Sequence, residues 1–255
     1  DVVDESTVGT YHVFGRAARQ EFLLGLNPST EWHYGHRKKI FYRRLELLAS
    51  VFAVECLDSD VLDNHFHLIL RNRLELVREW TDRQVAERWL RLNRAEIELR
   101  SPPKAMRLDA MVKDTKWIAE VRRRLSSISW FMAYLREPLA RVFNAEDERS
   151  GHFWERFGCV RLKDETSLLA CSLYLAMNPL RAGTATSVET SEHTSVHARL
   201  LDRLSGDPTR PHSGFMAAVH IDGDGYEGAA AGRRPSDKGY LPITFDEFLV
   251  LFEQM

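Results

Sequence analysis

The chain has 255 residues, of which 44% are hydrophobic and 28% are charged, and its formal net charge is −2. These values are ordinary for a globular protein with a sizeable core, and no uninterrupted apolar run approaches the length needed to cross a membrane. The negative total excludes a uniformly basic nucleic-acid-binding protein, so any contact with DNA must come from local basic clusters.

The first half of the chain predicts a helix between strands. Tyr11–Arg16 alternates as a strand does, and residues 36–49 form an amphipathic, basic helical pattern. Val51–Leu57 and Asn64–Arg71 are both rich in apolar and β-branched residues, which predicts a hairpin. Asp58-Ser59-Asp60 has the composition of a turn, so we expect the hairpin to reverse there.

Two histidines begin the second strand of this hairpin. His65 and His67 are separated by Phe66 and run into Leu-Ile-Leu. Because side chains alternate along a strand, both imidazoles should face one side while Phe66 anchors the other. On its own this spacing is more typical of a half-buried strand with a polar face. Paired imidazoles on a rigid strand also suit a divalent metal ion.

The second half of the chain completes one fold. Residues 82–90 predict a helix, residues 114–144 predict one long helix or two with a kink at Pro138, and Phe153–Leu162 predicts a last strand. This β-α-β-β-α-β order is the ferredoxin-like α+β pattern, an antiparallel sheet with helices on its faces. We expect the histidine strand in the centre of the sheet and residues 73–116 as a helical insertion.

A further helix follows the last strand. Asp164 can cap a helix that begins at Glu165, and Pro179 predicts that it ends near Asn178. Tyr174 and Asn178 are four residues apart and therefore share a helix face. That face offers a phenol and an amide oxygen together, although this segment on its own slightly favours a core tyrosine and a C-terminal Asn cap.

Basic residues gather at a few places despite the negative total. One cluster, interleaved with aromatic residues, lies at the start of the helix over residues 36–49, and another basic residue directly follows the tyrosine helix. A basic run is usually a solvated helix face, but beside a metal site that could polarise a phosphodiester it favours DNA contact. We expect five residues of the helix to be mostly exposed on the side of the histidines: Arg37, Lys38, Lys39, Arg43 and Arg44. These five and Arg181 are the candidates for binding DNA.

The motifs together resemble a known family. Asn-His-x-His with an aliphatic run at residues 64–70, followed by Tyr-x-x-x-Asn-Pro-x-Arg-Ala-Gly at residues 174–183, is similar to the pattern of the REP-associated tyrosine transposases. These belong to the single-tyrosine HUH transposases. Residues 11–16, 129–132, 143–144 and 150–157 also look like the family, and the resemblance covers about residues 9–185.

The resemblance implies a DNA transposase that cleaves single-stranded DNA and transfers the strand through a 5′-phosphotyrosine. It implies Tyr174 as the nucleophile, and His65, His67 and Asn178 as ligands of Mg²⁺ or Mn²⁺. The implied partner is single-stranded or hairpin DNA, bound by a monomer or a homodimer. Tyr134 is the rival nucleophile, but its apolar neighbours predict core packing.

Two other functions fit the same residues. A replication-initiator-like or relaxase-like nickase would share the site, although such proteins usually carry helicase or long accessory domains. A domesticated protein could bind repeat DNA without cleaving it, although an intact set of His65, His67, Tyr174 and Asn178 argues against decay.

The rest of the chain predicts an appendage. Residues 186–255 should form a C-terminal extension, with a flexible Gly/Ala-rich stretch at residues 222–232 and a short apolar helix capped by Thr244 that docks on the main domain. Cys56, Cys159 and Cys171 lack paired spacing, and no secretory pattern is visible at residues 1–4. These features favour reduced thiols in a cytoplasmic protein.

Overall fold

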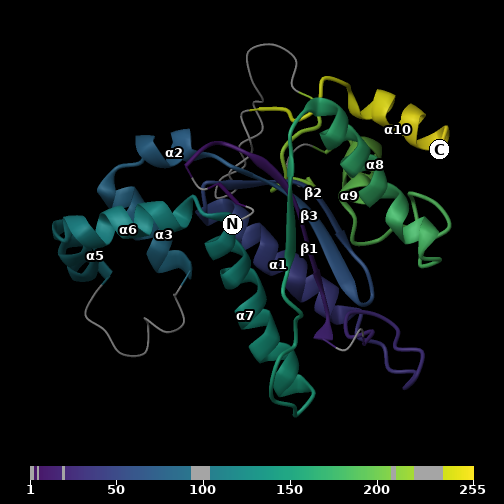
Figure 1. The fold of residues 1–255 in the computed structure, drawn as a ribbon, viewed down its shortest axis with the longest axis horizontal. Helices are drawn as coiled ribbons and strands as arrows, with labels where there is room; N and C mark the ends of the chain where they lie inside the picture. Colours follow the sequence, from purple (N-terminus) through teal and green to yellow (C-terminus); the bar gives the residue numbers. More distant parts are fainter. Residues whose placement is uncertain (1–2, 5, 19–20, 93–103, 208–210, 221–237) are drawn as a thin grey trace.

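The protein is an α+β structure built on a four-stranded antiparallel sheet (Figure 1). The computed structural model describes residues 3–4, 6–18, 21–92, 104–207, 211–220 and 238–255. The strands lie in the order β2-β3-β1-β4, and each neighbouring pair is antiparallel. Their bounds are β1 Thr10–Arg16, β2 Val54–Val61, β3 His65–Asn72 and β4 Gly158–Leu162. This order confirms the ferredoxin-like prediction, and the histidine strand β3 lies centrally.

Two helices cover one face of the sheet. They are α1 (His36–Val51), between β1 and β2, and α7 (Ile128–Glu146), before β4. Alternation along the strands directs Phe66 toward this face, where its ring centroid lies 5.0 Å from that of Phe41 on α1. Both rings belong to the larger hydrophobic core, so α1 anchors the face opposite to the histidines.

A second, smaller core covers the other face. It joins Leu57 and Ile69 of the sheet to α8 (Glu165–Arg181), α9 (Ser195–Ser205) and α10 (Phe245–Glu253). Figure 1 shows the strands between α1 and α7 on one side and α8, α9 and α10 on the other. The predicted cap at Asp164 is confirmed, because its side chain accepts from the backbone N–H of Ser167 in a capping box.

The tyrosine helix ends one turn later than the sequence predicted. Pro179 lies inside α8, which continues to Arg181. Proline removes only its own N–H from the helical ladder, and the backbone N–H of Ala182 still bonds the Asn178 carbonyl at 2.9 Å. Pro179 is itself buried, so packing holds the last turn in place.

The predicted turn at Asp58-Ser59-Asp60 is wrong, because these residues lie inside β2. The chain instead reverses after Val61, where the backbone N–H of Leu62 bonds the carbonyl of His65 at 2.9 Å. The local preference of these residues for a turn is outweighed here by contacts with residues far along the chain. The carboxylate of Asp58 is enclosed by side chains of the C-terminal extension, which leaves it fully partnered in the strand.

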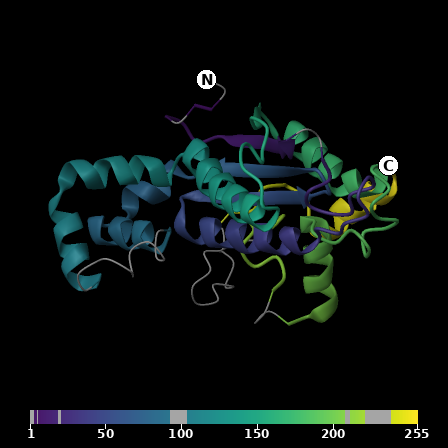
Figure 2. The ribbon, with the colours of Figure 1, turned by 90° about the horizontal axis from the view of Figure 1, so that it is seen from below.

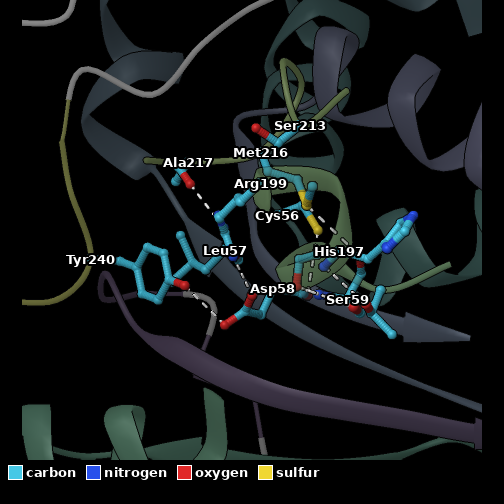
Figure 3. Close-up of polar contacts among 12 residues, drawn as sticks. Cys56, Leu57, Asp58, Ser59, His197, Arg199, Ser213, Met216, Ala217 and Tyr240 are labelled. Carbon is cyan, nitrogen blue, oxygen red and sulfur yellow. Dashed lines mark hydrogen bonds and ion pairs between the residues drawn. The ribbon is translucent and has the colours of Figure 1, made fainter. Parts of the chain in front are cut away.

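Figure 3 shows this enclosure. Arg199 of α9 donates to Asp58 Oδ1 at 2.6 Å, and the hydroxyl of Tyr240 donates to Oδ2 at 2.9 Å. Ser195 also donates to Asp58, and Arg199 donates to the carbonyl of Ala217 at 3.1 Å. All four side chains are buried at the join between sheet and extension.

The helix α9 was not predicted. The terminal helix α10, with its Thr244 capping box, was predicted, and its Phe248 docks in the smaller core as expected.

A group of helices extends from one end of the sheet (Figures 1 and 2). It comprises α2 (Leu74–Glu79), α3 (Asp82–Leu92), α5 (Lys104–Lys113) and α6 (Thr115–Leu125). The predicted long segment is thus two helices, since α6 ends and Ser127 caps α7 through the N–H of Trp130. Pro138 lies within α7.

Four further expectations concern the last strand, the Gly/Ala-rich stretch, membrane-spanning helices and the cysteines. The last strand is shorter than predicted, because Trp154 makes only an isolated bridge to Ala17 before β4 begins. The Gly/Ala-rich stretch at residues 222–232 lies outside the described residues. In the described part of the chain, no helix combines the length and apolarity needed to cross a membrane. The three cysteines are free thiols.

Candidate active site

His65 and His67 project from the same face of β3, as the sequence predicted. Their ring centroids lie 5.1 Å apart, at nearly perpendicular planes. The strand register places Phe14 and Arg16 of β1 opposite His67 and His65, and Asp60 of β2 opposite His67. Side chains of directly opposed residues share a face, so the sheet gathers these groups beside the histidine pair.

A third histidine, which the sequence did not predict, joins the pair. His12 of β1 lies with its Nε2 atom 2.9 Å from Nδ1 of His67, and the two rings stack at 5.1 Å. One ring donates and the other accepts, which fixes complementary tautomers. His12 is two residues from Phe14 and four from Arg16 in an alternating strand. His12 meets His67 because β1 pairs with β3, and this strand pairing cannot be deduced from the spacing of the two residues in the sequence.

Burial keeps these imidazoles uncharged near neutral pH. It lowers the pKa of His12 and of His65 to about 4 and that of His67 to about 3. The positive charge of Arg16 lowers the pKa of His65 and His67 further, and neighbouring rings add to the effect at His67. A neutral imidazole can offer a lone pair to a metal ion or a hydrogen bond to a substrate.

Tyr174 lies over the histidines on α8. Its ring centroid is 5.5 Å from that of His67 and 6.3 Å from that of His12, edge-on to both. Tyr174 is 38% exposed, so a substrate could reach it from solvent. The rival Tyr134 instead packs edge-on against Trp89, with ring centroids 5.6 Å apart, at the periphery of the larger core. The structure therefore confirms that Tyr134 is a packing residue.

Asn178 lies one turn beyond Tyr174 and is buried against β2. Its Nδ2 group donates to Oδ2 of Asp60 at 2.9 Å. Asp60 is 1% exposed, and burial raises the pKa of its carboxyl to about 7, against smaller opposing effects of Asn178 and Lys38. The other carboxylate oxygen, Oδ1, has no hydrogen-bond partner. The sequence did not identify Asp60, because it was assigned to a turn.

The basic cluster of α1 differs from its prediction. Arg37 is fully buried, donates to Glu146 and Asp147, and lies over the ring of Tyr34. The prediction that Arg37 is exposed is wrong, because its guanidinium forms ion pairs with Glu146 and Asp147 at the C-terminal end of α7. The helix α1 also packs on the face of the sheet opposite to the histidines, which the prediction did not expect, although Lys38 at its N-terminal end lines a cleft beside Asp60.

The remaining basic residues divide into two groups. Lys38 pairs with Asp63 at 2.7 Å, and Arg44 donates to the carbonyl of Tyr134, so both are half-buried. Exposed, as expected, are Lys39, Arg43 and Arg181. Exposed Arg16, opposite His65, is a further cation that the sequence analysis missed.

A cleft of about 540 Å³ adjoins the site. Its lining includes Asp60 and Pro179, which adjoin Asn178, together with Lys38, Asp63 and His193. The cleft therefore reaches from the neighbours of Asn178 to the N-terminal end of α1.

His65, His67 and Asn178, near Tyr174, carry donor atoms of kinds that bind divalent metal ions. Neutral imidazole nitrogens and an amide oxygen are ordinary ligands of such ions. Among the described residues, no group of three or more His, Cys, Asp or Glu side chains is arranged to hold a metal ion. A set formed by His65, His67 and Asn178 contains two such side chains and one amide, and therefore is a different kind of group.

Comparison with known proteins adds a distant likeness. No protein-family model and no curated protein matches the chain. It is similar to a solved structure described as "Structure of the REP associates tyrosine transposase bound to a REP hairpin", with a TM-score of 0.43 and 13% sequence identity. The alignment covers 89% of this chain and 93% of that chain. A similarity this weak assigns neither the family nor the activity. Fold and site define an α+β protein in which a half-exposed tyrosine faces uncharged histidines on an antiparallel sheet.

Proposed function

We propose that this protein cleaves and rejoins single-stranded DNA, with Tyr174 as the nucleophile and a divalent metal ion at His65, His67 and Asn178. The observation that carries the proposal is the position of the Tyr174 ring, 5.5 Å from His67, with Asn178 one turn along the same helix. The motif resemblance of these residues to the REP-associated tyrosine transposases supports the same function.

The chemistry is an exchange of phosphate esters. The Tyr174 oxygen attacks phosphorus and gives up its proton, the bond from phosphorus to the 3′ oxygen breaks, and that oxygen takes up a proton. The product is a 5′-phosphotyrosine and a free 3′-OH. Because one ester replaces another, a 3′-OH can reverse the step and join strands. A bound Mg²⁺ or Mn²⁺ would polarise a phosphate oxygen.

The chain's own residues account for substrate binding. Arg16 and Arg181 flank the histidines and Tyr174 with exposed positive charge, which suits the phosphates on either side of the scissile bond. Phe14 and Trp32 are exposed aromatic side chains that could stack on unpaired bases. Burial lowers the pKa of His193 in the cleft wall, and the nearby charges of Lys38 and Lys39 lower it further. Arg43 follows Lys39 one turn along α1. We infer that the strand continues from Tyr174 through the cleft toward these two cations.

A cleavage assay tests the proposal without a known target. A labelled library of single-stranded and hairpin oligonucleotides is incubated with the protein and Mn²⁺, and in parallel with EDTA. Transposase-like activity requires Mn²⁺-dependent products with a free 3′-OH and joined strands. Cleavage without joining would favour a nickase, and binding without cleavage would favour a repeat-DNA-binding protein. The absence of both cleavage and binding would contradict a DNA function.

A further inference from the structure

We propose that Asp60 is a positioning residue that turns the carbonyl oxygen of Asn178 toward the metal site. This inference rests on the proposed function and adds a residue that the histidine and tyrosine motifs do not contain. An asparagine side chain has a donor end and an acceptor end, which can exchange by a half-turn of the amide. Only the acceptor end can bind a metal ion, so something must select the orientation.

The contact between the two residues makes that selection. Asn178 Nδ2 donates to Asp60 Oδ2 at 2.9 Å, which ties down the nitrogen and leaves the amide oxygen directed elsewhere. An ionised carboxylate can accept but cannot donate, so in that form Asp60 rejects the flipped amide. Both side chains are buried, which removes water as a competing partner and strengthens the preference.

The surrounding structure holds Asp60 rigidly for this role. It lies in β2 between β3 and α8, directly opposite His67 in the strand register. Asp60 Oδ1 is buried without a partner, an arrangement that costs free energy and that packing alone does not require. Partners that orient metal ligands are commonly buried carboxylates of this kind.

Direct ligation by Asp60 is the competing explanation. Among the described residues, however, no three acidic, histidine or cysteine side chains are arranged around a common metal position, so Asp60, His65 and His67 do not form such a set. Asp60 therefore acts through Asn178. Replacement of an orienting partner typically weakens metal binding by about 10- to 100-fold.

The test is a double-mutant cycle with Mn²⁺ alone as the probe. The Mn²⁺ dissociation constant is measured for the metal-free full chain by loss of the free-ion resonance signal, without DNA. Asp60→Leu and Asn178→Ala should each weaken binding by about 10-fold or more, and the double variant should be no weaker than Asn178→Ala. Asp60→Asn retains an acceptor for Asn178 but adds a donor end that can also pair with the flipped amide, so its affinity should fall between those of the wild type and Asp60→Leu.

Asp63→Asn is the matched control, because Asp63 is a carboxylate on the same hairpin that pairs with Lys38. It should leave the Mn²⁺ dissociation constant nearly unchanged. Asp60→Ala enters the same cycle in place of Asp60→Leu if thermal melting shows that the leucine variant is unfolded.

The outcomes separate this inference from the proposed function. Additive losses in the double variant would show that Asp60 acts independently of Asn178 and would overturn the inference. A loss in Asp60→Asn as large as in Asp60→Leu would do the same, since it would indicate direct ligation by charge. Wild-type affinity in Asp60→Leu, together with a loss in Asn178→Ala, would reject the inference and leave the metal site intact. No Mn²⁺ binding by the wild type would overturn both.

Discussion

At the scale of single residues, the site depends on histidines that stay uncharged because their pKa values are lowered. Burial lowers the pKa of the sheet histidines to about 3–4, so they present lone pairs at neutral pH. Uncharged imidazoles do not repel a divalent cation. The lowered pKa values also reduce the stability of the fold in acid, because the unfolded chain binds protons that the folded chain does not bind. His193, in the cleft wall, shows this effect outside the proposed metal ligands.

Acid should reduce stability partly through His193. Burial, with Lys38 nearby, lowers its pKa to about 4, below the ordinary 6.5, so its contribution is complete above pH 6.5 and lost as pH falls toward 4. His193→Asn suits the left-handed backbone there, at φ 67°. In urea titrations, the variant should lose about 1 kcal/mol less than the wild type between pH 7 and pH 5, allowing for solvent screening. Equal losses in the two proteins would show that His193 titrates normally when folded.

At the scale of elements, the join between β2 and the C-terminal extension is a buried ionic contact. Arg199 and Tyr240 enclose the carboxylate of Asp58, two residues before Asp60 in the strand (Figure 3). Asp60 in turn contacts α8 through Asn178. The strand β2 thus links the extension to the helix that carries Tyr174, so damage at this join should loosen several elements together.

Arg199→Met should expose this dependence. The change keeps most of the side-chain volume but leaves Asp58 as an uncompensated buried charge, which typically costs about 3–5 kcal/mol. Urea unfolding should show a loss of this size, and limited proteolysis should cut first in the C-terminal extension. Arg203→Met is the control one turn along α9, where an exposed pair with Asp246 is worth at most about 1 kcal/mol. Equal effects of the two variants would mean that the buried contact is not what docks the extension.

At the scale of the whole molecule, the sequence was sufficient where the determining pattern is local. Strand alternation predicted the order of elements and the common face of His65 and His67, and the Asp164 cap predicted the start of the tyrosine helix. These features depend on residues within a few positions of one another. Their correct prediction placed Tyr174 and Asn178 on the face of α8 toward the sheet.

The sequence failed where a residue's partner lies far along the chain. Asp58 was assigned to a turn because its partners Arg199 and Tyr240 are more than 130 residues away. Arg37 was assigned to a DNA surface because Glu146 and Asp147 come more than 100 residues later. In each case a charged side chain of a type that is usually exposed is buried in an ion pair with a partner far along the chain.

Exposed basic residues of α1 should control the salt dependence of DNA binding, although the net charge of the chain is −2. Lys39→Ala with Arg43→Ala removes two proposed phosphate contacts. The logarithm of the single-strand affinity should then depend less steeply on the logarithm of salt, by about 1.4 for two contacts. Arg83→Ala with Arg123→Ala, which are exposed residues of the helical group remote from the cleft, should leave the slope unchanged. An unchanged slope in the α1 variant would mean that this helix end is only a solvated surface.

The most direct measurement of the central claim is the covalent adduct between protein and DNA. Denaturing electrophoresis and peptide mass spectrometry of a Mn²⁺ reaction should show a 5′-phosphate on Tyr174. Tyr174→Phe removes a single hydroxyl, so it should abolish the adduct and leave DNA binding nearly intact. Tyr134→Phe, in the packing cluster of α7, should retain the adduct. An adduct that survives Tyr174→Phe and disappears with Tyr134→Phe would contradict the account.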